Sequence, residues 1–434
     1  MSVFSSPYLA QCVRSLELNE LSWVARQSLS RRRRDLVARM MKGDILGRLD
    51  RLDMFKLVTV VRRLPLLDAH KSKWCTELQE DFPSLDSLIA LAFVFLPSLE
   101  KLESNWSMDP VFIWHLLLKA DSKKVDSSPS PFVLRNLTHL KVNSESPCGN
   151  SSEILPLFQM PALTHFFGSN WGPIRRHGWD DGAETQAEDL DSGRGLVASP
   201  LTHLELRSCN VDLYTLQTIL KHCRSVRTFI FHRDWDPRIH VRLSGGSLTK
   251  ALSPLWGTLQ NMALSFEPGI YIHQEGEIYP LDFSQFSVLT KLNVDAGYLI
   301  HDPEDYEDCF SPYESESDEE RTSLQDRLPG SLEVLCITGF STPPQMQFLI
   351  DDCCRMLQRR SRFPRFRELA IEAPFEDSEI VFDTKALQQE ALRADVLFRK
   401  IDMTDHENEE YQLLTSEGCD WGMNGEFRWG TKVF

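Results

Sequence analysis

The sequence has no long apolar run. Its longest candidate, Leu85 to Leu96, is interrupted by Asp86 and Ser87, whereas a membrane-spanning helix needs roughly 18 uninterrupted apolar residues. The opening stretch, MSVFSSPYLAQCVRS, has no charged segment followed by an apolar core, so we expect no secretory signal. These absences favour a cytoplasmic or nuclear protein over a secreted or membrane-bound one.

Cysteines at metal-site spacing are also lacking. Among ten cysteines the one close pair, Cys353 and Cys354, is vicinal and has no second pair nearby, which does not match a zinc motif. Without export, we expect reduced cysteines that serve mostly as small core residues, and unglycosylated sequons at Asn105, Asn136 and Asn150.

Conventional enzyme motifs are missing as well. The sequence holds no phosphate loop, no Gly-x-Ser-x-Gly elbow and no His-Glu-x-x-His segment, and each of these spacings is what its chemistry requires. We therefore predict a protein that is not an enzyme and that carries no cofactor.

Basic residues are outnumbered, at 47 against 63 acidic ones, which gives a net charge of −16. This balance disfavours nucleic acid as a partner and suits a basic protein surface better. One basic run, Arg31 to Arg34, continues into an amphipathic pattern, which favours a solvated helix face over a nuclear import signal or a nucleic-acid patch.

What the sequence does contain is a repeat. Leu-Thr-His-Leu occurs at 137–140 and 201–204, and Leu-Thr-His at 163–165. The wider template is apolar-x-x-apolar-x-apolar, and the copies that start at Leu99 and Leu163 lose its last apolar position. The eight steps from 99 to 366 average about 33 residues, somewhat above the roughly 20 to 29 of a leucine-rich repeat. The template starts at Val13, Leu99, Leu137, Leu163, Leu201, Val226, Leu259, Leu289, Leu332 and Phe366.

Helical spacing of apolar residues alternates with these strand-like segments. It predicts helices over 35–49, 54–64, 111–120, 213–223, 248–256, 345–360 and 385–394, with Pro254 ending the fifth of these early. A final strand is expected over 396–403. Strand-plus-helix units bury their apolar residues only when stacked, so the pattern indicates an α/β leucine-rich-repeat solenoid, with a curved parallel sheet on the concave side and helices on the convex side.

Three regions are expected along the chain. Residues 1–84 form a mainly helical N-terminal region with a first repeat strand. Residues 85–403 form the irregular solenoid, in which 302–320 is a disordered insertion because its ten acids cannot bury a core face. Residues 404–434 form a C-terminal cap or tail. Within the insertion, Ser315 and Ser317 lie among acids and are possible phosphorylation sites, although an inert solvated loop is the favoured interpretation.

The unit from Leu201 to Val226, LTHLELRSCNVDLYTLQTILKHCRSV, resembles the cysteine-containing leucine-rich repeat, in which two cysteines, here Cys209 and Cys223, bracket a helix. From Val13 to about Met403 the chain is similar to fungal F-box/leucine-rich-repeat proteins. The resemblance implies an F-box that binds the adaptor of a cullin ubiquitin ligase and repeats that hold the substrate. The sequence departs from this family because no Leu-Pro-x-Glu-Ile-x-x-x-Ile segment precedes the first repeat, so the F-box is either lost or lies upstream of this chain.

Strand alternation nominates a binding surface. The first, fourth and sixth template positions point inward, and the third and fifth point to the opposite, solvent-facing side. On a concave face these side chains would bind an extended protein ligand. The candidates are His139, Lys141, His203, Glu205, Thr228, Ile230, Asn261, Lys291, Asn293 and Glu368.

The third position holds a possible histidine column. On consecutive parallel strands, His139, His165 and His203 would stack about 4.8 Å apart. They could serve a metal-dependent hydrolase, but zinc needs ligands that converge tetrahedrally, and a flat ladder does not supply that geometry. We therefore expect no metal and favour a protein-binding surface, either a ubiquitin-ligase substrate receptor or a stand-alone scaffold, with the hydrolase as a remote alternative.

Overall fold

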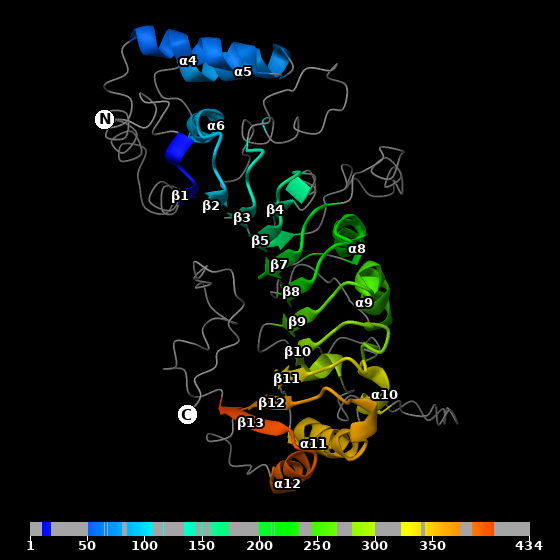
Figure 1. Ribbon diagram of the computed structural model, residues 1–434. Coiled ribbons are helices and arrows are strands. Elements are labelled where there is room, and N and C mark those ends of the chain that lie inside the picture. Colours follow the sequence, from blue (N-terminus) through cyan, green and yellow to red (C-terminus); the bar gives the residue numbers. More distant parts are fainter. Residues whose placement is uncertain are drawn as a thin grey trace, which may run out of the picture. The chain divides into compact units, whose positions relative to one another are not determined.

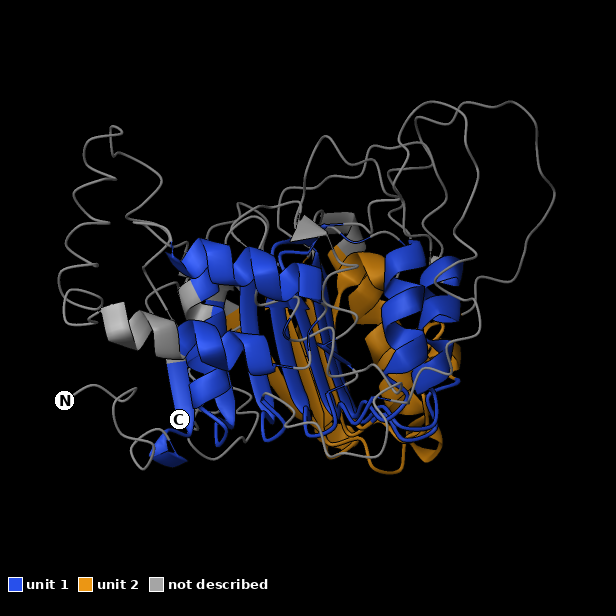
Figure 2. Cartoon of the chain, turned by 90° about the horizontal axis from the view of Figure 1, so that it is seen from above, with its two compact units in different colours: residues 1–270, 285–289 blue, residues 271–284, 290–434 orange. Residues whose placement is uncertain are grey.

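The computed structural model describes residues 11–18, 51–64, 66, 68–79, 85–106, 116, 134–144, 149–150, 157–158, 160–172, 199–209, 211, 213–233, 245–266, 280–299, 323–339, 343–373 and 384–402. The fold is α/β, with helices between parallel strands (Figure 1). The chain divides into two compact units, residues 1–270 with 285–289 and residues 271–284 with 290–434 (Figure 2).

Seven parallel strands form the sheet of the first unit. They follow chain order, and each pairs with the next. Every strand begins two residues after a template start. The strands are β1 (Ser15–Leu18), β2 (Lys101–Trp106), β3 (His139–Ser144), β5 (His165–Ser169), β7 (His203–Arg207), β8 (Thr228–Arg233) and β9 (Asn261–Phe266).

Template apolar residues form the core of this unit. Leu140, Phe166 and Leu204 lie side by side in register and are at most 1 % exposed. Each such side chain contributes about 1.5 to 3 kcal/mol on burial. The stacking of like residues along neighbouring strands therefore explains why the template recurs.

Gly168 occupies the sixth template position of β5 because Trp171 fills the space of the missing side chain. A Cβ on Gly168 would lie 2.8 Å from Cε1 of Phe166 and 3.1 Å from the indole of Trp171. Trp171 is buried in the two-residue strand β6 (Trp171–Gly172), which pairs with β4 (Gly149–Asn150). In the weaker repeat copy at Leu163, Trp171 therefore fills the core position that an apolar side chain fills in the other copies.

Helices cover the apolar side of the strands in this unit. On α8 (Leu213–His222), Leu216, Ile219 and Leu220 are fully buried, and α9 (Gly245–Leu252) lies beside it (Figure 1). As predicted, α9 ends early, since Pro254 lies in the following 3-10 turn Ser253–Leu255. Cys209 and Cys223, on either side of α8, are buried free thiols.

Three further helices precede β2. The predicted helix over 54–64 is confirmed as α4 (Arg51–Arg63), and α5 (Asp68–Gln79) and α6 (Leu85–Phe95) follow it. The Trp74 indole of α5 donates a hydrogen bond to the Ser87 carbonyl of α6 at 3.1 Å. Residues 1–84 belong to the first unit, in which β1 pairs with β2, and the boundary expected at residue 84 stays a prediction.

The second unit repeats the pattern with four parallel strands. These are β10 (Lys291–Asp295), β11 (Val334–Thr338), β12 (Glu368–Ala373) and β13 (Leu397–Asp402), with α10 (Leu324–Arg327), α11 (Pro343–Gln358) and α12 (Lys385–Arg393) between them. On β13 the exposed Lys400 lies opposite the buried Ile371. The apolar core row of this unit thus gives way to a charged residue at its last strand.

Several sequence predictions fall on residues outside this description, namely Arg31 to Arg34, the helix over 35–49, most of the helix over 111–120, the insertion 302–320 and the tail 404–434. Among the described helices, none is long and apolar enough to cross a membrane.

Candidate functional site

The outward face of the first unit, opposite its apolar core, carries two rows of aligned side chains. In the first row, the register places Lys101, His139, His165, His203, Thr228 and Asn261 side by side; in the second, Glu103, Lys141, Phe167, Glu205, Ile230 and Ala263. The predicted alignment of the third and fifth template positions is therefore confirmed from β3 to β9.

The threonine of each Leu-Thr-His segment links neighbouring strands. The Thr138 hydroxyl donates to the Glu100 carbonyl at 3.0 Å, and the Thr164 and Thr202 hydroxyls donate to the Thr138 and Thr164 carbonyls at 3.1 and 3.2 Å. Because each hydroxyl hydrogen is used in this way, its oxygen is left to accept hydrogen bonds.

Two histidines use those oxygens. Nδ1 of His139 lies 2.8 Å from the Thr138 hydroxyl, and Nδ1 of His165 lies 2.9 Å from that of Thr164. A neutral imidazole therefore carries its proton on Nδ1 in both residues and presents Nε2 as an acceptor. His203 is engaged through its other nitrogen, since its Nε2 lies 3.4 Å from Oε2 of Glu205 and donates to that carboxylate.

The rings form the predicted column. The centroids of His139 and His165 are 4.2 Å apart with planes 7° from parallel, and those of His165 and His203 are 5.5 Å apart at 24°. Burial, and then the charges of neighbouring histidines and Lys101, lower the pKa of His165 to about 4; burial and Lys101 also lower the pKa of His139. These two rings are therefore neutral near pH 7.

Stacked rings cannot share a metal ion. Ring nitrogens coordinate in the plane of the imidazole, and nearly parallel planes send their lone pairs along parallel lines instead of toward one point. Within the described part of the chain, no three histidine, cysteine or acidic side chains gather as metal ligands. This geometry gives the hydrolase alternative no support.

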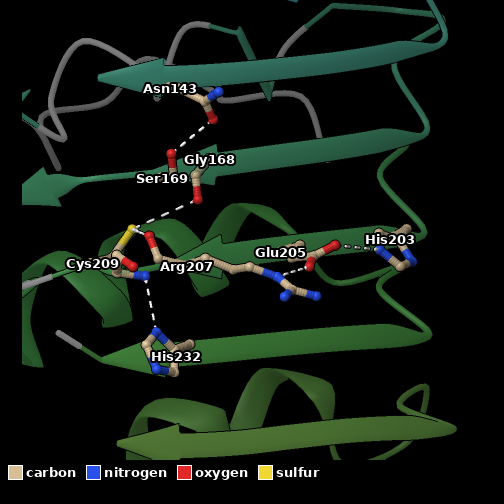
Figure 3. Close-up of polar contacts among 9 residues, drawn as sticks. Asn143, Gly168, Ser169, His203, Glu205, Arg207, Cys209 and His232 are labelled. Atoms are coloured by element: carbon tan, nitrogen blue, oxygen red, sulfur yellow. Dashed lines mark hydrogen bonds and ion pairs between the residues drawn. The ribbon is translucent and has the colours of Figure 1, made fainter. Parts of the chain in front are cut away.

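An ionic network crosses the second row. Nζ of Lys141 lies 2.6 Å from the Glu103 carboxylate and 5.3 Å from the Phe167 ring centre. On the other side of Phe167, the Arg207 guanidinium lies 5.8 Å from the ring centre and pairs with Glu205 (Figure 3). Phe167 is thus held between two cations, each with its own carboxylate.

Glu205 is ionised although only 4 % of it is exposed. Burial alone would raise its pKa, but the hydrogen bond from His203 and the charge of Arg207 outweigh burial and hold the pKa below its ordinary value. A buried carboxylate of this kind persists only while its partners remain in place.

The far end of the strands is fixed by polar contacts as well (Figure 3). The Ser169 hydroxyl donates to Oδ1 of Asn143 at 2.7 Å, and the Ser208 amide donates to Nδ1 of His232 at 3.2 Å. The Cys209 thiol donates a hydrogen bond to the Arg207 carbonyl at 3.1 Å. These hydrogen bonds order the outward side of the strand ends, at Asn143, Ser169 and Arg207, and none of them adds a reactive group.

Solvent exposure departs from prediction on this face. His139, Lys141, His203 and Asn261 are partly exposed, whereas Glu205, Thr228 and Ile230 are buried, at 4, 9 and 4 % exposure. The expectation that the fifth position faces solvent is therefore wrong for Glu205 and Ile230. Side chains in adjacent strands are about 4.8 Å apart, so large residues such as Phe167 shield their row neighbours.

The remaining candidates lie in the second unit. Lys291 and Glu368, at the third template position, are partly exposed. Asn293, at the fifth template position, was expected to face solvent but is buried at 5 % exposure. Ser315 and Ser317 lie outside the described residues.

Four contributors were missed at the sequence level, namely Lys101, Glu103, Phe167 and Arg207. The first three belong to the two weaker template copies, and their position in those copies was the available signal. Arg207 lies one residue beyond the template, where no pattern marks it.

Comparison with known proteins adds no family. No family model matches the sequence, and the search of curated proteins gives no match. The outward face is therefore interpreted from its own chemistry.

Proposed function

We propose that this chain is a leucine-rich-repeat solenoid that binds another protein on its outward strand face, without enzymatic activity, as the substrate-recognition subunit of a cullin ubiquitin ligase. The observation that carries the proposal is the outward face of the first unit, where six strands in register, β2 to β9, present histidine, lysine, aromatic and amide side chains in continuous rows. An extended array of this kind suits a protein ligand.

The polar network supports binding in preference to catalysis. Cations and carboxylates on this face pair with each other, and the neutral rings of the column are stacked instead of converging on one point. Rigid, prepaired side chains lower the entropy cost of association.

The test compares affinity capture by the intact chain with capture by a variant whose outward face is blocked. Ser169→Lys with Ser265→Lys places two long charged side chains at partly exposed outward positions of β5 and β9. A matched control, Ser72→Lys with Ser225→Lys, makes the same chemical change at exposed positions off this face. We expect a bound protein that the control retains and the blocked variant loses; retention by both contradicts the proposal.

The ubiquitin-ligase role is tested separately, by mixing the purified chain with a purified cullin–adaptor complex. Co-elution of the two supports the receptor. A face-dependent partner without co-elution leaves a stand-alone scaffold.

A further inference from the structure

Lys101 is an uncompensated cation on the outward face. It lies opposite His139 in the register of β2 and β3 and is partly buried. Its ammonium forms no hydrogen bond or ion pair with any residue that the structure describes. The two acids nearest to it in sequence are already engaged, because Glu100 pairs with Arg14 at 3.1 Å and Glu103 with Lys141 at 2.6 Å.

The charge balance around Lys101 differs from that of the chain as a whole. The outward positions of β1, β2, β3, β5 and β7 carry Lys101, Lys141 and Arg207 against Glu17, Glu103 and Glu205, which is three cations minus three acids, or zero. The whole chain carries −16. A neutral face that carries the cation Lys101 can attract an isolated anionic group, while the acidic remainder of the chain repels a polyanion such as nucleic acid.

The neighbouring histidines can follow an anion by taking up protons. His139 and His165 stack beside Lys101, and their Nε2 atoms are acceptors in the neutral form. Protonation would convert Nε2 into a charged donor. Of the other charged groups on the packed strands, Glu103 pairs with Lys141, and Glu205 pairs with Arg207 and His203. Glu17 on β1 lies opposite Glu103 in the register.

We infer that Lys101, His139 and His165 form a docking site for an acidic side chain of the protein partner, a carboxylate or a phosphate ester on an extended segment. This inference deepens the proposed function and rests on it. Docking consumes protons, because an anion beside the column favours the imidazolium form that burial, and then Lys101 and the stacked neighbours, disfavour.

The size of the pH effect follows from His165. Its pKa is about 4 in the free chain, against an ordinary value of 6.5. If the bound anion restores that ordinary value, affinity rises about tenfold between pH 7.5 and pH 5.5. The sign is fixed, since the bound state has the higher pKa and therefore binds more tightly as pH falls.

The experiment uses the full chain and three fluorescein-labelled octapeptides in fluorescence polarisation. One alternates Glu and Ala, the second phosphoserine and Ala, and the third Lys and Ala. We expect the two acidic peptides to bind more tightly at pH 5.5 than at pH 7.5 and the basic one not to share that gain. The stronger of the two acidic peptides identifies the anion.

Variants locate the site. Lys101→Gln should weaken acidic-peptide binding about fivefold. Lys250→Gln, which removes an exposed lysine of α9 off the outward strand face, should leave binding unchanged. The double variant His139→Asn with His165→Asn should keep the Lys101 contribution and lose the gain at pH 5.5. Thermal melting verifies that each variant is folded.

Three results would overturn the inference: no binding of either acidic peptide, equal losses in Lys101→Gln and Lys250→Gln, or an unchanged pH gain in the histidine variant. Failure of the proposed function gives a different result. If the blocked-face variant loses a native partner that Lys101→Gln still binds, the proposed function stands and this docking site is refuted. If acidic peptides bind through Lys101 but no partner depends on the outward face, the docking site stands and the proposed function is refuted.

Discussion

Replacing Glu205 by Gln should be among the most destabilising polar changes on the outward face. The substitution keeps the size of the side chain and removes its charge, which leaves Arg207, itself only 12 % exposed at the side chain, without its carboxylate. Removing one member of a buried ion pair costs about 3 to 5 kcal/mol. Arg207 keeps its position over the Phe167 ring, so we expect the lower figure, about 3 kcal/mol.

Thermal unfolding followed by circular dichroism measures the effect. A loss of about 3 kcal/mol corresponds to a fall in Tm of about 6 to 12 °C for a unit of this size. The matched control is Glu333→Gln, because Glu333 pairs with Arg367 across 3.4 Å while 64 % of the arginine side chain is exposed. An exposed pair contributes less than about 1 kcal/mol.

The pH dependence supplies a second check. The pKa of Glu205 is lower in the folded state than its ordinary 4.5, so its contribution is complete above that value and is lost as pH falls through the folded pKa. The difference between wild type and Glu205→Gln should therefore be constant from pH 6 to 8 and shrink below pH 4.5. The double variant with Arg207→Gln should recover part of the loss, since it removes the orphaned charge. A Glu205→Gln Tm within 1 °C of wild type refutes this account of the network.

Three further predictions concern single sites. In NMR of histidine-labelled chain, His165 should titrate near pH 4 and carry its neutral proton on Nδ1; a midpoint near 6.5 would contradict the buried stack. Gly168→Ala should cost about 1 to 3 kcal/mol through its clash with Phe166, whereas Gly246→Ala, which meets nothing within 4 Å on α9, should cost nothing; equal Tm changes would contradict that contrast. Burial raises the pKa of the Cys223 thiol, so mass spectrometry after brief alkylation should find the exposed Cys12 modified and Cys223 intact; early modification of Cys223 would show that its surroundings open readily.

The strands were predictable because the template is read in the same frame in every repeat. Leu137 and Leu163 each end a turn, and β3, β5 and β7 begin two residues after Leu137, Leu163 and Leu201. Side-chain alternation then places His139, His165 and His203 in one row, as the sequence indicated.

Helices without a clear apolar stripe were not predictable in the same way. In α6, LDSLIALAFVF, apolar residues occupy nearly every position, so no period distinguishes a helix from a buried strand. In α5, charged residues interrupt the pattern around Trp74, which is buried by contact with α6.

The burial of Glu205 and the role of Arg207 depend on neighbours in other repeats. Whether a fifth-position side chain is covered is decided by Phe167 one strand away, and alternation within a single strand carries no such information. The tautomers of His139 and His165 likewise depend on the Thr138 and Thr164 hydroxyls. These hydroxyls donate to carbonyls 38 and 26 residues earlier in the chain.

That threonine ladder bears on how the repeats can diverge. The Thr138, Thr164 and Thr202 hydroxyls reach back across 38, 26 and 38 residues, yet each meets the carbonyl at the same place on the preceding strand. Alignment is set at the entrance of each strand and does not depend on the length of the segment before it. Insertions and deletions between these strands can therefore accumulate during evolution without shifting the outward rows, so connecting segments can diversify while the binding face is inherited unchanged.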